Sequence, residues 1–278
     1  MSGFSSSTGS SNVGVGYQTL YNNTAGYDNV AVGREALRAN TTGANNTSIG
    51  YKALTANTTG LRNVGVGYQA GDSITTGQDN ICIGYIAGNT LTTGGNMVAI
   101  GSEAGRVATS GSNVFLGSKA GRNTTTASSL TYVGPNAGQD ATGSQQTLIG
   151  ASAGYSATGG QNTCVGYQAG DSITSGYNNL VLGYTADASS ATVNNEITLG
   201  NASITSLRIP GLQSGASDGQ VLTYSSSNGN ITLADAGGGL SNNSSQTYSL
   251  GIGTNALDSE NSSGNYNTAV GYLSLIHI

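Results

Sequence analysis

Acidic side chains are the groups in this sequence whose chemistry comes closest to catalysis. Glycoside hydrolysis uses a pair of carboxyl groups that flank the scissile bond, and the candidates are Asp72, Asp79, Glu103, Asp140 and Asp171. Asp72 and Asp171 occupy matching Gly-Asp-Ser-Ile-Thr turns, which suit capping of backbone amides better than catalysis. No acid pair can be named from the spacing. We therefore predict that the chain is not an enzyme, with a glycan-degrading protein as a less favoured alternative.

Nucleophiles and metal ligands are equally sparse. His277 is the sole histidine, so no Ser–His or Cys–His system can be assembled, and histidine-based metal sites are not expected. Calcium-binding solenoids carry Asp in most turns, whereas these turns carry Thr, Asn or Ser. Cys82 and Cys164 occupy the same repeat position five copies apart, beyond disulfide reach within one chain. We predict two small buried thiols, no metal and no cofactor; contact between symmetry-related thiols near a threefold axis is the alternative.

Charge and composition exclude several partners. The 278 residues include 45 glycines, only 8% charged residues and a net charge of −5. Eight lysines and arginines are scattered without a basic stripe, so nucleic-acid binding is not expected. No apolar run approaches the ~20 residues of a membrane-spanning helix, so no membrane insertion is expected. Low charge and evenly spaced aliphatic residues argue against disorder.

The elements that must position any site come from a repeat. A glycine recurs every 17 or 16 residues, and two further copies follow a gap, at Gly253 and Gly271. Such a period indicates stacked coils. The repeat glycines are Gly16, Gly33, Gly50, Gly67, Gly84, Gly101, Gly117, Gly134, Gly150, Gly166, Gly183 and Gly200.

Each copy begins with a short strand. A branched aliphatic residue precedes the glycine, and an aliphatic residue or threonine stands two positions earlier, as in Val30-Ala-Val32. These two side chains share one face of the strand, and we expect them to be buried in the coil. The residue between them is small in early copies and bulkier later, as in Phe115 and Tyr132. An almost invariant alanine and a polar turn such as Asn40-Thr-Thr-Gly complete the copy, which predicts one coil of a parallel β-solenoid.

Three repeated side chains suggest surface features. An asparagine opens most copies and predicts a structural ladder, with a ligand site as the alternative; these residues are Asn12, Asn29, Asn46, Asn63, Asn80, Asn113, Asn162 and Asn179. Tyrosines that follow the glycine favour packing at a coil edge or between chains over a sugar-binding face; these are Tyr17, Tyr51, Tyr68, Tyr85, Tyr167 and Tyr184. Threonine pairs align over four copies, which raises ice binding, but they lack the Thr-x-Thr spacing of a flat array; these pairs are Thr41-Thr42, Thr58-Thr59, Thr75-Thr76 and Thr92-Thr93.

Two motifs then carry a family resemblance. Asn29-Val-Ala-Val-Gly-Arg-Glu-Ala-Leu and Asn63-Val-Gly-Val-Gly-Tyr-Gln-Ala-Gly resemble head repeats of trimeric autotransporter adhesins (YadA-like heads), and more closely the related repeats of bacteriophage tail fibres. The resemblance implies an all-β, left-handed parallel β-roll with three chains to a head. A thin coil core independently favours an oligomer, because each coil orders many residues around few apolar side chains.

The resulting domain prediction has four parts. Residues 1–11 are a polar lead, 12–205 the array of about twelve coils, 206–245 a β-hairpin connector with a Gly-rich linker, and 246–278 a second partial array. The hairpin is expected to pair Gln220-Val-Leu-Thr-Tyr with Asn230-Ile-Thr-Leu-Ala around Asn228-Gly229. Residues 273–278 resemble a translated sequencing-library adapter, so we expect a truncated fragment.

The functional prediction follows the resemblance. We expect a structural, receptor-binding segment of a virion tail fibre that trimerises and attaches to a glycan or protein of the host surface. The alternative is a bacterial surface adhesin head at the cell surface. Ice binding and glycan degradation stand below both.

Overall fold

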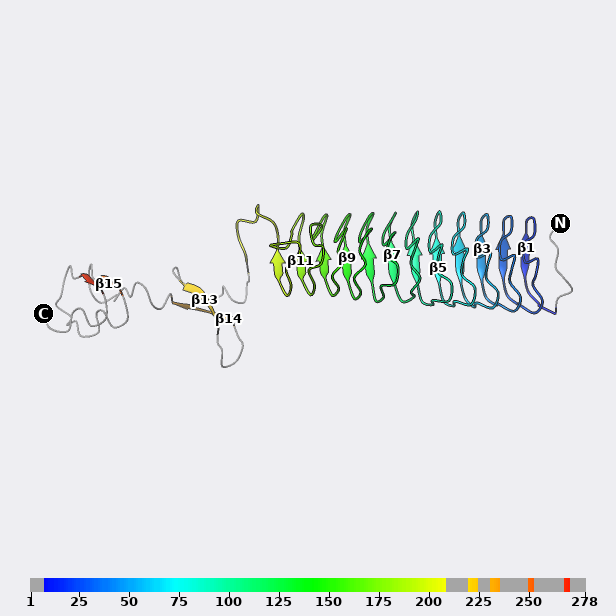
Figure 1. The fold of residues 1–278 in the computed structure, drawn as a ribbon, viewed down its shortest axis with the longest axis horizontal. Coiled ribbons are helices and arrows are strands. Elements are labelled where there is room, and N and C mark those ends of the chain that lie inside the picture. The colour runs from blue at the N-terminus through cyan, green and yellow to red at the C-terminus, as the bar shows by residue number, and fades with distance from the viewer. Residues whose placement is uncertain (1–7, 209–219, 225–230, 236–249, 253–267, 271–278) are drawn as a thin grey trace. The chain divides into compact units, whose positions relative to one another are not determined.

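A computed structural model shows an all-β solenoid of about eleven turns. It describes residues 8–208, 220–224, 231–235, 250–252 and 268–270. Twelve three-residue strands form one parallel sheet in sequence order (Figure 1). They are β1 (Val13–Val15), β2 (Val30–Val32), β3 (Thr47–Ile49), β4 (Val64–Val66), β5 (Ile81–Ile83), β6 (Val98–Ile100), β7 (Val114–Leu116), β8 (Thr131–Val133), β9 (Thr147–Ile149), β10 (Thr163–Val165), β11 (Leu180–Leu182) and β12 (Ile197–Leu199).

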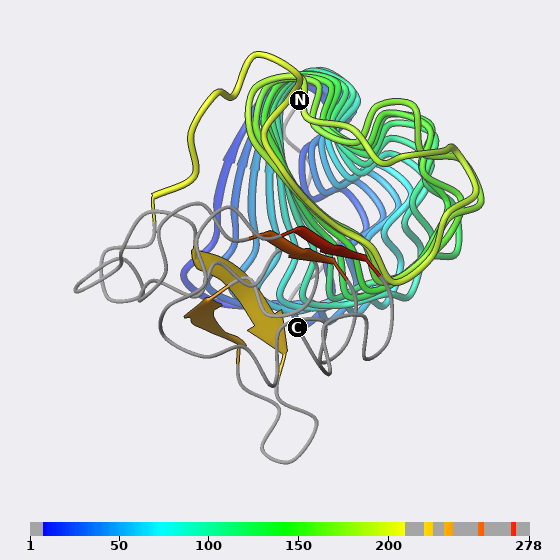
Figure 2. The same ribbon diagram turned by 90° about the vertical axis from the view of Figure 1, so that its left-hand side faces the viewer.

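The register confirms the repeat alignment. Val13 pairs with Val30, Val30 with Thr47 and Thr47 with Val64, so equivalent residues stack from coil to coil. The end-on view in Figure 2 shows the coils superimposed around a common interior. Backbone amides outside the strands also bond to the next coil, as in Thr58 N to Thr75 O at 2.9 Å. Each coil therefore satisfies its polar backbone through its neighbours.

The strand faces are opposite to the sequence prediction. The central residue of each strand from β2 to β11 is buried in the coil interior, as Ala31, Cys82 and Tyr132 illustrate with 0% exposure. The flanking aliphatic residues, expected to be buried, lie on the outer face and are half-buried or exposed. A shift of one residue in the assignment of strand faces exchanges every side chain between the two sides. The near-invariant alanines, such as Ala36 and Ala87, do lie inside.

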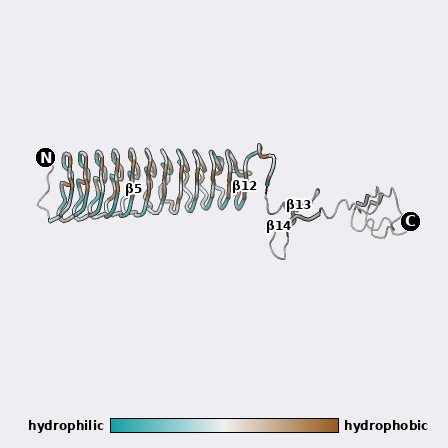
Figure 3. Tube along the Cα trace, turned by 180° about the vertical axis from the view of Figure 1, so that it is seen from behind, coloured by the Kyte–Doolittle hydropathy of each residue, from teal (hydrophilic) through white to brown (hydrophobic). Residues whose placement is uncertain are grey.

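In several coils the large interior side chain comes from one of two positions: the centre of the strand, or the residue that follows the near-invariant alanine. In early coils Leu20, Leu37 and Leu54 fill the interior beside small central residues; a Cβ on Gly65 would lie only 2.7 Å from Leu54 Cγ. In coils seven to nine the central residue is large, as Phe115, Tyr132 and Leu148 show, and the leucine position holds glycine. The glycine of the preceding coil, Gly105, also lies against Phe115. A Cβ on Gly105 would lie 2.6 Å from Phe115 Cδ2. The interior thus holds one large side chain in most coils and two, Leu130 and Tyr132, in the eighth. Figure 3 shows the hydrophobic residues recurring at the same level of successive coils.

The chain divides into two compact units, residues 1–204 and 205–278. In the second unit the predicted hairpin is present as β13 (Gln220–Tyr224) antiparallel to β14 (Ile231–Asp235), with Leu222 opposite Leu233. Its turn, with Asn228 and Gly229, lies outside the described residues. The restarted repeat forms β15 (Leu250–Ile252) parallel to β16 (Thr268–Val270). Gly253, Gly271, His277 and residues 273–278 lie outside the described ranges.

Candidate functional site

The repeat glycines lie at the corner where each strand ends. From Gly16 to Gly183 their φ angles range from +127° to +140°, a conformation that side-chain-bearing residues rarely adopt. A Cβ on Gly67 would also lie 2.5 Å from the carbonyl oxygen of Gly84 in the next coil. Gly200 in the last copy differs, with φ +80°. Backbone conformation and close stacking therefore both exclude a side chain at this corner.

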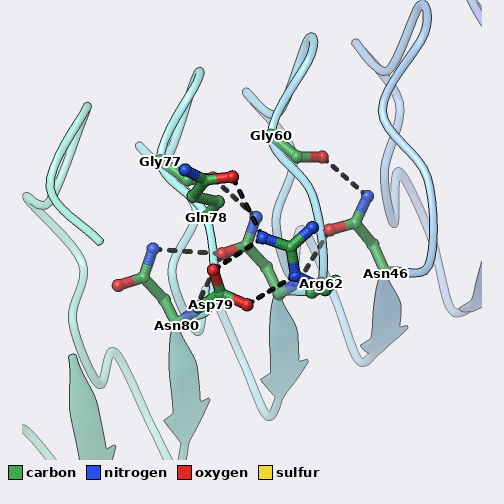
Figure 4. Close-up of polar contacts among 8 residues, drawn as sticks. Asn46, Gly60, Arg62, Gly77, Gln78, Asp79 and Asn80 are labelled. Carbon is green, nitrogen blue, oxygen red and sulfur yellow. Dashed lines mark hydrogen bonds and ion pairs between the residues drawn. The ribbon is translucent and has the colours of Figure 1, made fainter. Parts of the chain in front are cut away.

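The predicted asparagines form a buried ladder along the opposite end of the strands (Figure 4). Asn63 Nδ2 donates to Gly77 O at 2.8 Å, and Asn63 N donates to Asn46 Oδ1 at 2.9 Å. Asn63 Oδ1 accepts from Asn80 N at 3.1 Å and from Asn80 Nδ2 at 3.0 Å. Through its backbone amide and its side chain, each asparagine thus bonds to the equivalent asparagines of the coils before and after it. Because these polar atoms are occupied and buried, the geometry favours a structural ladder over a ligand site.

The ladder tolerates gaps in its register. Met97 and Leu130 replace asparagine in their coils, yet their backbone amides still donate to Asn80 Oδ1 at 3.0 Å and Asn113 Oδ1 at 3.1 Å. Glu196 N likewise donates to Asn179 Oδ1 at 2.9 Å. The backbone amide is therefore capped even where the asparagine is lost.

A second asparagine ladder in the first coils was not predicted. Asn40 Nδ2 donates to Asn23 Oδ1 at 2.8 Å and to Gly43 O at 2.9 Å, and Asn57 Nδ2 donates to Asn40 Oδ1 at 2.9 Å. The recurring Asn-Thr-Thr-Gly turns carried the signal for it. Ile74 and Leu91 take this interior position in later coils, so the ladder gives way to apolar packing.

The outer face of the sheet is an apolar surface. We call it the outer-face stripe; it comprises the first and third residues of β1–β12, which are aliphatic except for Thr47, Thr131, Thr147 and Thr163. Ile49, Leu116 and Ile149 are 41%, 43% and 37% exposed. With strands ~4.8 Å apart and ~10 Å of strand length, the stripe covers on the order of 500 Å². That lies in the upper range of the largest apolar patch on a typical monomer.

Half-exposed tyrosines stack beside the corner glycines. The rings of Tyr51 and Tyr68 lie 5.1 Å apart at 17°, and those of Tyr68 and Tyr85 lie 5.4 Å apart at 21°. Tyr167 and Tyr184 form a similar pair at 5.4 Å. Arg34 lies between Tyr17 and Tyr51, 5.8 and 5.7 Å from their ring centroids. The tyrosines therefore pack along the coil edge, as favoured from the sequence, and remain partly exposed.

Most basic residues gather into two clusters, contrary to the prediction that they are scattered. The first cationic cluster consists of Arg34, Arg38 and Lys52 around Glu35, with nitrogen–oxygen distances of 3.1, 3.9 and 3.8 Å. Sequence separation hid this grouping, because Lys52 is one coil away from Glu35.

The second cationic cluster lies four coils later, around Glu103. Arg106 and Arg122 lie 3.5 and 2.6 Å from Glu103. Lys119 completes the cluster by register: its backbone amide donates to Ser102 O at 2.8 Å, as that of Lys52 donates to Arg34 O at 2.9 Å. The second cluster thus places two arginines on one carboxylate, with Lys119 at the register position that Lys52 occupies in the first.

Asp72 and Asp79 are held by separate partners. Asp72 accepts from Asn89 Nδ2 at 2.7 Å and Gln69 Nε2 at 3.2 Å, and burial raises its pKa. The two carboxylate oxygens of Asp79 accept hydrogen bonds from Nε and Nη2 of Arg62 at 2.6 and 2.7 Å (Figure 4). These bonds lower the pKa of the Asp79 carboxyl. This fork joins two adjacent coils beside the asparagine ladder.

The other carboxylates also lie in distinct settings. Asp140 accepts from Asn123 Nδ2 at 2.5 Å. Burial, and then the nearby charge of Asp187, raises the pKa of Asp171. Glu103 belongs to the second cationic cluster. The five acids considered for catalysis are therefore spread along the array, each engaged in its own contacts.

The threonine pairs and the cysteines take part in coil packing. Thr41 Oγ1 donates to Thr58 O at 3.0 Å, and Thr58 Oγ1 donates to Thr75 O at 3.1 Å, so the first threonine of each pair links coils. Cys82 and Cys164 are free and buried inside the coils, which rules out the alternative of thiols meeting at an outer threefold axis. Burial raises the pKa of both thiols to about 12, with Asp187 adding to the effect at Cys164.

No protein-family model, curated protein or solved structure matches this chain. Within the described ranges there is no helix long and apolar enough to cross a membrane, and no group of three or more His, Cys, Asp or Glu side chains that could hold a metal ion.

Proposed function

We propose that the chain is a structural, receptor-binding segment of a virion tail fibre in which three copies associate through the outer-face stripe. The observation that supports this proposal most strongly is that the aliphatic pairs of the strands lie on the outer face of the sheet. Branched side chains that would serve a coil core instead point outward in register along the twelve-stranded sheet. An exposed, mainly aliphatic surface of this extent is often functional on a soluble protein, and association is the use we propose for it.

The stripe fits a second and third copy of the same chain as its partners. Its aliphatic side chains recur at the spacing of the strands, so the stripe of a second copy offers aliphatic side chains at the same interval along the axis. The threefold count rests on the resemblance of Asn29–Leu37 and Asn63–Gly71 to trimeric fibre and adhesin repeats. Association would add a second buried layer to coils whose interiors mostly hold one large side chain.

In this proposal the assembled rod attaches to a glycan or protein of the host surface by multivalent presentation. Equivalent side chains recur every coil, and three chains multiply each contact. A bacterial surface adhesin head is the second candidate, and the same repeat resemblance supports it. Immunogold labelling separates the two: label on virions supports the fibre, and label on the bacterial envelope supports the adhesin.

A cell-adhesion assay tests the link between association and attachment. The variant Ile49→Asp, Leu116→Asp, Ile149→Asp places three charges on well-separated exposed positions of the stripe. We expect it to lose multivalent binding to host cells by about a hundredfold. The control Thr42→Asp, Thr93→Asp, Thr142→Asp adds the same charge at exposed turns and should bind as wild type. Equal adhesion by both variants would contradict the proposal.

A further inference from the structure

We propose that the two cationic clusters form one elongated binding site for an anionic polysaccharide. This inference rests on the proposed function, and it names the chemistry of the receptor. The clusters hold six of the eight lysines and arginines of the chain, and they occupy equivalent turns of coils four steps apart. At ~4.8 Å per coil their separation along the rod is ~19 Å.

In each cluster the central carboxylate is more buried than the cations around it, so the exposed charge is positive. The Glu35 side chain is 10% exposed, whereas those of Arg34, Arg38 and Lys52 are 60%, 45% and 33% exposed. One hidden carboxylate therefore holds three accessible cations in place and neutralises only one of them. In the second cluster the Glu103 side chain is 17% exposed, and those of Arg106 and Arg122 are 39% and 29% exposed. Each cluster presents two excess positive charges on a chain of net charge −5.

Fixed cations suit sulfate, phosphate or carboxylate groups of a ligand. Arg34 is held at 3.1 Å by Glu35 and lies over the Tyr51 ring, and Lys52 Nζ lies 5.5 Å from the same ring. These contacts restrict the long side chains before a ligand arrives, which lowers the entropic cost of binding. Arginine also pairs with such anions through two parallel hydrogen bonds.

The interval between the clusters favours a polysaccharide over a nucleic acid. Tyr68 and Tyr85, at 45% and 53% exposure, continue the stack from Tyr51 toward the second cluster. Their rings offer apolar edges and hydroxyl groups to uncharged sugars. Asp72 also lies in this interval. A nucleic acid carries a phosphate every ~3.4 Å per strand and would pass phosphates across that carboxylate, whereas a polysaccharide with spaced charges places neutral sugars there.

Affinity for immobilised dextran sulfate, with uncharged dextran as reference, tests the site on the full chain. The variant Arg38→Gln, Lys52→Gln, Arg106→Gln, Lys119→Gln removes four cations but keeps Arg34 and Arg122, the closest partners of Glu35 and Glu103. We expect dextran sulfate binding at least about tenfold weaker, with a shallower salt dependence. Glu35→Gln with Glu103→Gln should strengthen binding about threefold, and Arg62→Gln, outside the clusters, should stay within about twofold.

Three outcomes would overturn the site. The first is equal binding to dextran and dextran sulfate, and the second is a quadruple variant that binds dextran sulfate as tightly as wild type. The third is duplex DNA that binds as tightly as dextran sulfate and depends on the clusters in the same way. Sedimentation of the same samples reports on the proposed function separately. A monomer would refute the fibre proposal, whereas an oligomer whose dextran sulfate binding is unchanged by the cluster substitutions would refute only this site.

Discussion

Removing one rung of the asparagine ladder should destabilise the solenoid far more than removing an exposed asparagine. In Asn63→Ala the array loses the bond to Gly77 O at 2.8 Å and the two bonds accepted from Asn80 at 3.1 and 3.0 Å. Asn63 and Asn80 are both fully buried, so water cannot replace these partners. With ~1 kcal/mol net per bond and a penalty for the stranded groups, we expect a loss of about 3–5 kcal/mol.

Equilibrium urea denaturation, followed by far-ultraviolet circular dichroism, measures this loss. Asn22→Ala is the matched control, because Asn22 lies exposed in a turn and its replacement should cost less than about 0.5 kcal/mol. If the two variants lower the free energy of unfolding equally, the ladder does not stabilise the stack and the hydrogen-bond reasoning is wrong.

Three further predictions concern the coil corner, one buried acid and the thiols. Gly67→Ala should destabilise by about 2 kcal/mol or more in denaturation, because its φ is +132° and the Cβ would lie 2.5 Å from Gly84 O; a wild-type midpoint would contradict this. Burial raises the pKa of Asp72 above its ordinary 3.8, so the folded state binds this proton more tightly than the unfolded state does. Its contribution to stability is therefore present at low pH and is lost as pH rises through the raised value; Asp72→Asn should flatten that part of a stability–pH curve, and an unchanged slope would refute the assignment. Cys82 and Cys164, whose pKa values are raised to about 12 by burial, should resist alkylation when folded and react in denaturant; rapid native labelling would contradict their burial.

The sequence was sufficient to predict the repeat, but the prediction of which strand face is buried was wrong. The glycine spacing predicted the strands and their register, because a corner with φ near +130° and a neighbouring carbonyl permits only glycine there. The alternation of side chains along a strand does not say which face points into the coil. The sequence prediction placed the regular aliphatic pair inside. A closed coil instead holds variable, mutually compensating residues inside, as Leu54 beside Gly65 and Phe115 beside Gly105 show. That size exchange was visible in the sequence and identifies the inner face.

Contacts between coils explain what the sequence left hidden. Residues separated by 17 positions meet as nearest neighbours, as Lys52 meets Glu35 and Asp79 meets Arg62. Basic residues that look scattered along the chain therefore gather in two clusters at equivalent turns of the solenoid. The asparagine ladder was predictable because most copies repeat it, whereas the cationic clusters occur in only two places and carry no periodic signal.

Sedimentation equilibrium of the full chain tests the central claim most directly. We predict a folded species of three times the 27.6 kDa chain mass. The Ile49→Asp, Leu116→Asp, Ile149→Asp variant should shift toward monomer, whereas the Thr42→Asp, Thr93→Asp, Thr142→Asp control should not. A stable, folded wild-type monomer would contradict the account.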